Sequence, residues 1–183
     1  MKNKKVCWSA VLALLIFVAV LAVDLLTKHF VVKALPNVGD SKEVLPGFIN
    51  FIFVKNTGAA WGVLSGRPIF LIVLTLVILG LYLTFFILNL KKNGKKSSKL
   101  FGICAGFIFG GCLGNLVDRI FLGYVRDFIN FQFISFPVFN VADMALCVGV
   151  VLLAIYFIFI YPKECKRNEQ SSDQQALSGK EGK

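Results

Sequence analysis

Three aspartates, Asp24, Asp118 and Asp143, stand at the ends of long apolar runs in this sequence. A carboxylate near the centre of a membrane helix costs about 2.5 to 3.5 kcal/mol on insertion scales. Acids that persist in such positions usually face the interior of a helix bundle or a wet cavity, where they have a function. We therefore expect the chemistry of this chain to be concentrated near these acids.

Two neighbouring carboxylates would give the chain both an acid and a base. Asp118, Asp127 and Asp143 all fall at the adjoining ends of the last two apolar runs, which one loop connects. Carboxylates about 4 Å apart repel by roughly 4 kcal/mol at an effective dielectric near 20, so that one of them stays protonated at neutral pH. The ionised partner can then activate a water, and the neutral partner can hydrogen-bond a peptide carbonyl, as in aspartic proteases.

Two of these acids also have a structural interpretation. Asp24 and Lys28 are spaced i, i+4 on a helix, which favours an internal ion pair that lowers the cost of insertion. Asn140 and Asp143 have the spacing of an N-cap residue and the N3 residue, and the helix dipole favours a carboxylate there. Capping of the last helix is as good an interpretation of Asp143 as chemistry.

The remaining acids each have a basic neighbour in the sequence. Asp118 is followed by Arg119 and lies three residues after Asn115, an arrangement that would neutralise the acid and satisfy the carbonyls at a helix end. Asp127 follows Arg126 in a loop, where a surface salt bridge is the alternative to catalysis. Spacing alone leaves open which two acids form a pair.

The composition requires a membrane to position these residues. The chain has 183 residues, of which 57% are hydrophobic and 16% charged, with a mean hydropathy of +0.76. That is too apolar for a soluble domain. Apolar runs long enough for a hydrocarbon core of about 30 Å occur four times. We expect one domain over residues 1–167 with spans at about 6–32, 68–90, 100–117 and 141–161.

Lysine-rich clusters set the orientation of these spans. They precede the first span, fill the loop between the second and the third, and follow the fourth. The positive-inside rule places all three clusters, and therefore both termini, in the cytoplasm, with the acids near the outer face. The net charge of +10 is mostly a topology signal, and the clusters lack the interleaved aromatic residues of a nucleic-acid site. The polar tail 168–183 is predicted to be disordered.

The two outer loops differ from the lysine-rich inner loop. Residues 48–54 alternate like a strand, and residues 123–130 and 131–139 also read as extended segments. Residues 58–66 suit a short interfacial helix containing Trp61. The predicted fold class is therefore an all-α membrane protein with four transmembrane helices, small extracytoplasmic β segments that form a cradle, and a short interfacial helix.

A glycine recurs at every fourth position of the third span, at Gly102, Gly106, Gly110 and Gly114. Such a row lies on one face of a helix and allows a neighbouring membrane helix to approach closely. Its simplest interpretation is a packing contact. Because the row leads directly to Asn115, we expect this close packing also to fix the polar site.

Zinc, disulfide and serine-protease chemistry are disfavoured. The five cysteines have no paired spacing and lie mostly in or beside spans, and the single histidine, His29, adjoins Lys28 at a helix end. A zinc site or a Ser-His-Asp triad needs histidine in a suitable cluster. We expect neither a metal nor a cofactor.

Four ordered motifs resemble those of the bacterial lipoprotein signal peptidases, or signal peptidase II. They are VDLLTK at 23–28, KNTGAAWG at 55–62, GGCLGNLVDRIFLGYVRDF at 110–128 and FNVADMALCVG at 139–149. The resemblance implies four helices in the bacterial cytoplasmic (inner) membrane, with both termini in the cytoplasm. It further implies an aspartate dyad near the outer face that cleaves diacylglyceryl-modified prolipoproteins before the lipidated cysteine. The cyclic peptide globomycin would be an inhibitor.

The resemblance also chooses between the acids. It implies that Asp127, in the V-x-D-F stretch, and Asp143, in N-x-A-D, are the catalytic pair. The matching residues that would support the site or contact substrate are Asn56, Asn115, Asp118, Arg119 and Asn140, together with the polar pair Asp24 and Lys28 of the first span.

The chain departs from the family pattern at Leu25, Arg126 and Met144. Leu25 stands where a polar residue is common, and Met144 where a small hydroxyl residue is frequent. Arg126 replaces the usual valine, and a cation beside Asp127 would favour its ionised form and make it the base.

Two alternatives outside peptidase chemistry remain at this point. A small proton- or ion-coupled transporter would also carry intramembrane acids, although the acids here gather at one face and the two halves show no inverted repeat. A packing subunit would explain the glycine row but not the density of polar groups at one outer site.

Overall fold

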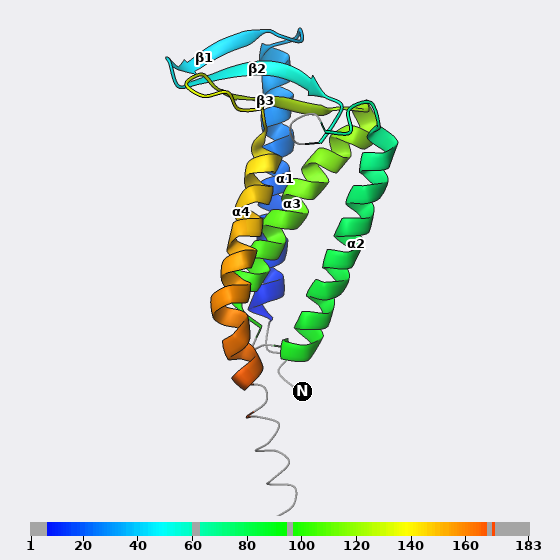
Figure 1. Ribbon diagram of the computed structural model, residues 1–183, viewed down its shortest axis with the longest axis vertical. Coiled ribbons are helices and arrows are strands. Elements are labelled where there is room, and N and C mark those ends of the chain that lie inside the picture. Colours follow the sequence, from blue (N-terminus) through cyan, green and yellow to red (C-terminus); the bar gives the residue numbers. More distant parts are fainter. Residues whose placement is uncertain (1–6, 60–62, 95–96, 168–169, 171–183) are drawn as a thin grey trace, which may run out of the picture.

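Four long helices stand below a small sheet in the computed structural model, which describes residues 7–59, 63–94, 97–167 and 170 (Figure 1). Each of these helices is long and apolar enough to cross a membrane, as the sequence predicted. Their bounds are Trp8–Ala34 for α1, Pro68–Asn93 for α2, Lys99–Leu122 for α3 and Val141–Ile155 for α4, which continues through the π-helical segment η3, Tyr156–Ile160, to Arg167. The predicted tail 168–183 lies almost wholly outside the described residues.

Local signals in the sequence account for the helix ends. Pro68 occupies the first turn of α2, where its missing N–H costs nothing. Gly123 ends α3 in the left-handed conformation, with φ 77°, and donates its N–H to the carbonyl of Arg119. The third helix thus runs past the predicted end at 117, because its last polar side chains find partners and do not interrupt it. Asn140 and Asp143 form a capping box that starts α4, as predicted.

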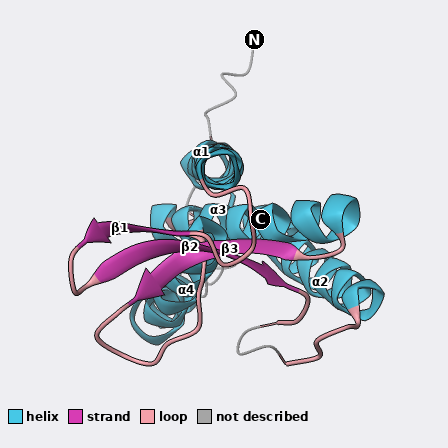
Figure 2. Ribbon diagram, turned by 90° about the horizontal axis from the view of Figure 1, so that it is seen from above, coloured by secondary structure: helices cyan, strands magenta, loops and turns pink. Residues whose placement is uncertain are grey.

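A three-stranded antiparallel sheet, ordered β1-β2-β3, lies across one end of the bundle (Figures 1 and 2). The strands are Ser41–Leu45, Ile49–Asn56 and Val125–Phe131. This confirms the extended segments predicted at 48–54 and 123–130, whereas the segment predicted at 131–139 forms only an isolated bridge from Phe139 to Ile129. In the register of β2 and β3, Asn56 pairs with Val125 and Val54 pairs with Asp127. The sheet therefore brings polar residues of two distant loops to the end of the helices beneath it.

The short interfacial helix predicted at 58–66 is not seen in the described part of that segment. Residues 63–66 form a turn in which Leu64 has φ 60° and Gly66 has φ 76°. Two left-handed residues so close together are incompatible with a right-handed helix. Trp61 lies outside the described residues.

The glycine row of α3 packs against α1. A Cβ atom at Gly106 would lie 2.7 Å from Cβ of Ile16, and one at Gly110 would lie 2.7 Å from Cβ of Val20. No side chain fits in that space, so the row is a close-packing face, as predicted. The most apolar stretch of α3 is 61% buried, against 11 to 17% in the other three helices, which makes α3 the centre of the bundle.

Aromatic side chains hold the opposite end of the bundle together. The ring centroids of Phe101 and Tyr156 are 5.0 Å apart, and those of Phe86 and Phe101 are 5.3 Å apart. These contacts join α2, α3 and the η3 segment. Toward the sheet, α2 lies apart from α1 and α4 (Figures 1 and 2).

Candidate active site

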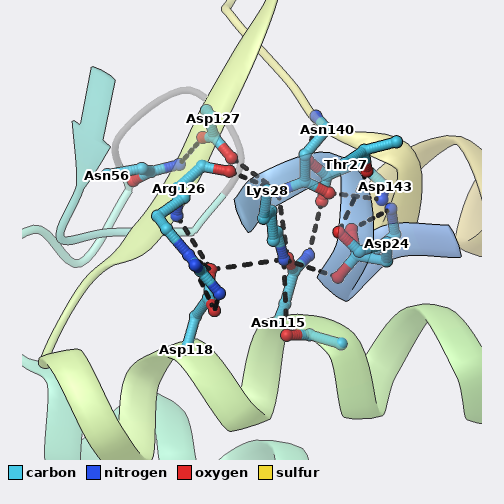
Figure 3. A network of polar contacts seen from close by, with 12 residues as sticks. Asp24, Thr27, Lys28, Asn56, Asn115, Asp118, Arg126, Asp127, Asn140 and Asp143 are labelled. Atoms are coloured by element: carbon cyan, nitrogen blue, oxygen red, sulfur yellow. Dashed lines mark hydrogen bonds and ion pairs between the residues drawn. The ribbon is translucent and has the colours of Figure 1, made fainter. Parts of the chain in front are cut away.

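Most of the polar residues singled out in the sequence meet between the sheet and the adjoining ends of α1, α3 and α4 (Figure 3). Asp127 lies on β3, and Asp143 lies in the first turn of α4. Asn56 comes from β2, Asn115 from α3 and Lys28 from α1. Five separate elements therefore contribute to one site.

Asp127 is a buried carboxylate held by two amides. Its Oδ2 accepts a hydrogen bond from Nδ2 of Asn56 at 2.8 Å, and its Oδ1 accepts one from Nδ2 of Asn140 at 2.6 Å. Only 2% of the residue is exposed. Burial, and next the negative charge of Asp143, raise the pKa of Asp127 to about 7, although both amides oppose the shift.

Asp143 combines a capping role with an accessible position. Its Oδ2 accepts the backbone N–H of Asn140 at 3.1 Å, and its own N–H donates to Oδ1 of Asn140 at 3.0 Å. Its Oδ1 accepts from Nδ2 of Asn115 at 2.7 Å. The capping interpretation is confirmed, and it does not exclude chemistry, because the cap fixes a half-buried carboxylate at the positive end of a helix.

Asn140 and Asn115 connect the two acids. Asn140 is fully buried, and its Nδ2 lies 3.0 Å from Oδ1 of Asn115 as well as 2.6 Å from Asp127. Asn115 in turn donates to Asp143. Each amide thus donates from its Nδ2 to one carboxylate, and the two amides are joined by the hydrogen bond from Asn140 to Asn115, so both carboxylates are fixed relative to each other.

Lys28 is a fully buried ammonium group at the base of the site. Its Nζ lies 2.8 Å from Oδ2 of Asp24 and 3.3 Å from Oδ2 of Asp118, and it donates to Oδ1 of Asn115 at 2.9 Å. The predicted ion pair with Asp24 is confirmed. A buried ion pair is stable only when further hydrogen bonds satisfy both groups, and here the lysine reaches α3 to find them.

Asp24 links α1 to the start of α4. Its Oδ1 accepts the backbone N–H of Ala142 at 2.9 Å. A Cβ atom at Gly114 would lie 2.5 Å from Oδ2 of Asp24, so the last glycine of the row makes room for this carboxylate. The expectation that the glycine row also fixes the polar site is consistent with this contact.

Asp118 is paired with Arg126 and not with Arg119, contrary to the interpretation from sequence. Nη2 of Arg126 lies 2.6 Å from Oδ1 of Asp118, and the backbone N–H of Arg126 donates to Oδ2 at 3.0 Å. Arg119 instead donates from Nη2 to the carbonyl of Gly58 at 2.8 Å. Adjacent residues on a helix do not face each other, so sequence neighbours are poor candidates for an ion pair there.

The expectation that Arg126 would favour the ionised form of Asp127 was also wrong. Successive side chains of a strand point to opposite faces, and on β3 this sends the guanidinium of Arg126 to Asp118 (Figure 3). The pKa of Asp127 is raised and not lowered. No salt bridge to Asp127 is present among the described residues. The alternation of side chains along the strand was the sequence signal that could have predicted that Arg126 points away from Asp127.

The charges of the site balance when the two acids share one proton. Four carboxylates lie here, those of Asp24, Asp118, Asp127 and Asp143, against the three cations Lys28, Arg119 and Arg126. One proton on the pair Asp127 and Asp143 leaves three negative and three positive charges. Buried charges without partners are costly, so a balance of this kind lowers the cost of burying the cluster.

Comparison with known proteins gives one consistent result. The sequence model of the family described as Signal peptidase (SPase) II matches residues 16–159. A lipoprotein signal peptidase of Staphylococcus carnosus is 41% identical over 150 residues, which cover 81% of this chain and 91% of the relative. One from Enterococcus faecalis is 38% identical over 144 residues, 79% of this chain and 86% of the relative.

Solved structures agree with the sequence relatives. Two structures described as a bacterial membrane enzyme superpose with TM-scores of 0.71 and 0.70, each at 36% identity. They cover 80% and 81% of this chain, and 87% and 93% of their own chains.

Proposed function

Because this chain belongs to the signal peptidase II family, we propose that it is an aspartic endopeptidase that removes the signal peptides of diacylglyceryl-modified bacterial prolipoproteins. Asp127 and Asp143 are the proposed catalytic pair, and cleavage falls before the lipidated cysteine. The transporter and the packing subunit are set aside, because the family consists of peptidases.

The observation that carries this proposal is the pair of carboxylates joined by Asn140. Asp127 has a pKa raised to about 7, through burial and the charge of Asp143. Asp143 accepts a backbone N–H at the N-terminus of α4 and an amide N–H of Asn115, which together fix its position. A buried carboxyl with a raised pKa beside a second, half-buried carboxyl is suited to acid and base roles.

In the proposed mechanism Asp143 is the base and Asp127 carries the shared proton. Asp143 takes a proton from a water, which attacks the peptide carbonyl carbon, while Asp127 transfers its proton to the carbonyl oxygen. The tetrahedral intermediate then collapses. Asp143 gives its proton to the leaving amine, and Asp127 takes one back from the intermediate, so the pair ends with one proton again.

The remaining polar residues position this pair. Asn56, Asn115 and Asn140 hold the two carboxylates through hydrogen bonds. The group formed by Lys28, Asp24 and Asp118 fixes Asn115 and the start of α4 from below. Such support matters because catalytic groups must stay near their productive geometry before substrate binds.

We place the site at the outer face of the cytoplasmic membrane. Lysines at the junction of α2 and α3 and at the end of α4 lie at the end of the bundle opposite the sheet, which the positive-inside rule assigns to the cytoplasm. The sheet and the acids then face outward, where the acyl chains of a lipidated cysteine can remain in the outer leaflet.

The test is cleavage by the purified protein in lipid nanodiscs. A precursor peptide with a diacylglyceryl cysteine is expected to yield a product that begins at that cysteine, by mass spectrometry, and globomycin is expected to block the reaction. The same peptide without the lipid serves as the control and is expected to remain intact. Failure to cleave the lipidated peptide, or cleavage at another bond, would contradict the proposal.

A further inference from the structure

A second buried polar cluster lies at the opposite end of the bundle from the catalytic pair. Asn89 of α2 lies 3.5 Å from the hydroxyl of Tyr156 through its Nδ2, and its Oδ1 accepts from the hydroxyl of Ser97 at 3.3 Å. The Tyr156 hydroxyl donates to Oε2 of Glu164 at 2.9 Å. Nothing in the proposed mechanism uses these residues.

Glu164 is the unusual member of this cluster. Only 6% of the residue is exposed, yet it forms no ion pair within the described residues, where its one hydrogen bond comes from Tyr156. Buried carboxylates in proteins are normally paired with a cation. The carboxylate is therefore poised to accept a positive charge from outside the bundle.

A cavity of about 140 Å³ adjoins this carboxylate. It opens between α2 and the end of α4, and Glu164, Asn89 and the ring of Tyr161 are among the residues that line it. A carboxylate, an amide oxygen and an aromatic ring together suit an ammonium or guanidinium group. Lys92 also borders the cavity, and its charge would repel a cation that enters.

Glu164 is an acid placed among lysines at this end of the bundle. The basic residues here include Lys91, Lys92, Lys163 and Lys166, whereas Glu164 is the one acid at this end among residues 97–167 and 63–94. A basic segment of a substrate would be repelled by the surface in general. It would be attracted only at this cavity.

The distance along α4 matches the length of a signal peptide. Asp143 and Glu164 lie on one continuous helical span that ends at Arg167, separated by 21 residues, or about 31 Å at 1.5 Å per residue. Signal peptides have 15 to 30 residues, with a basic n-region at one end and the cleavage site at the other. A helical signal peptide whose scissile bond lies at the dyad thus brings its n-region to the level of Glu164.

We propose that the cavity between α2 and α4 binds a lysine or arginine side chain of the signal peptide's n-region, with Glu164 as its counter-charge. This inference rests on the proposed function and makes Glu164 a specificity-determining residue about 31 Å from the chemistry. It supplies a cationic partner to a buried carboxylate that has none among the residues that the structure describes.

Two lipidated precursor peptides that differ only in the n-region, lysine against glutamine, test the inference in zwitterionic nanodiscs. The wild-type protein is expected to show a KM on the order of fivefold lower for the lysine peptide, with equal kcat. Glu164→Gln is expected to remove this preference by raising KM for the lysine peptide alone. Lys92→Gln is expected to increase the preference, because it removes a competing cation.

Two further variants serve as controls. Tyr156→Phe removes the hydrogen bond to Glu164 but leaves its charge, and is expected to keep the preference for the lysine peptide. Glu43→Gln makes the same chemical change on the exposed strand β1 and is expected to leave both KM values unchanged.

The two proposals fail in different ways. No cleavage of either peptide by the wild-type protein would refute the proposed function and this inference with it. Cleavage of both peptides with equal KM values, or an unchanged preference in a folded Glu164→Gln variant, would refute this inference alone and reduce Glu164 to a structural partner of Tyr156.

Discussion

The raised pKa of Asp127 predicts a pH dependence of stability that one substitution should remove. The ordinary pKa of an aspartate is 3.8, and in the folded protein that of Asp127 is about 7. Each pKa unit corresponds to about 1.4 kcal/mol, so a difference of about three units is worth on the order of 4 kcal/mol. Burial and the charge of Asp143 make the ionisation of Asp127 less favourable by this amount in the folded protein than in the unfolded chain.

The sign follows from proton binding. Between pH 3.8 and about 7 the folded protein retains the proton on Asp127, whereas the unfolded chain has lost it. The contribution of Asp127 to the unfolding free energy therefore falls as pH rises through this window and is flat on either side. Asp127→Asn has no proton to lose, so its unfolding free energy should lack this fall.

Thermal unfolding in detergent measures the effect at several pH values from 4 to 8. The Tm of Asp127→Asn minus that of the wild-type protein is expected to increase by on the order of 10 °C across this range. The new amide group faces the donors of Asn56 and Asn140, which shifts the Tm of the variant by the same amount at every pH. The test is therefore the change of the Tm difference with pH and not its absolute value. Glu43→Gln, on the exposed β1 strand, is the control and should parallel the wild type. Parallel curves for Asp127→Asn would refute a raised pKa.

Three further outcomes follow from the contacts. Gly114→Leu should lower both Tm and activity, because even a Cβ atom there meets Asp24 at 2.5 Å; unchanged values would show that α1 and α3 do not pack as described. Arg126→Val should lower stability by about 1 to 3 kcal/mol in chemical unfolding, since Asp118 keeps Lys28 and a backbone N–H but loses its bidentate partner; no loss would mean that this pair is not formed. In topology assays, a reporter near position 37 should be external and one after residue 183 cytoplasmic; the same side for both would show that one helix does not cross.

Local periodicity was enough to predict most elements and several contacts of the fold. The i, i+4 spacing of Asp24 and Lys28 predicted their ion pair, and the N-cap to N3 spacing predicted the capping box of α4. The alternation at 48–54 predicted β2. Each of these is decided within one element, so neighbouring residues carry the information.

Contacts between elements were beyond the sequence pattern. Asp118 finds Arg126 because Gly123 turns the chain from α3 back along β3, and Lys28 reaches Asp118 because the glycine row brings α1 close to α3. Neither of these two contacts follows from the spacing of residues within one element. The prediction that Arg126 acts on its sequence neighbour Asp127 named the wrong partner. The choice of Asp127 and Asp143 as the catalytic pair came from a family resemblance, and it stays a prediction.

Cleavage assays of the individual aspartate variants test the central claim most directly. Purified Asp127→Asn and Asp143→Asn should each be folded, bind globomycin and fail to cleave a lipidated precursor, because each lacks one of two coupled proton-transfer groups. Asp118→Asn should retain measurable cleavage at reduced stability, since its carboxylate contacts Arg126 and Lys28. Residual cleavage by Asp127→Asn, together with a folded and wholly inactive Asp118→Asn, would contradict the account and make Asp118 and Asp143 the working pair.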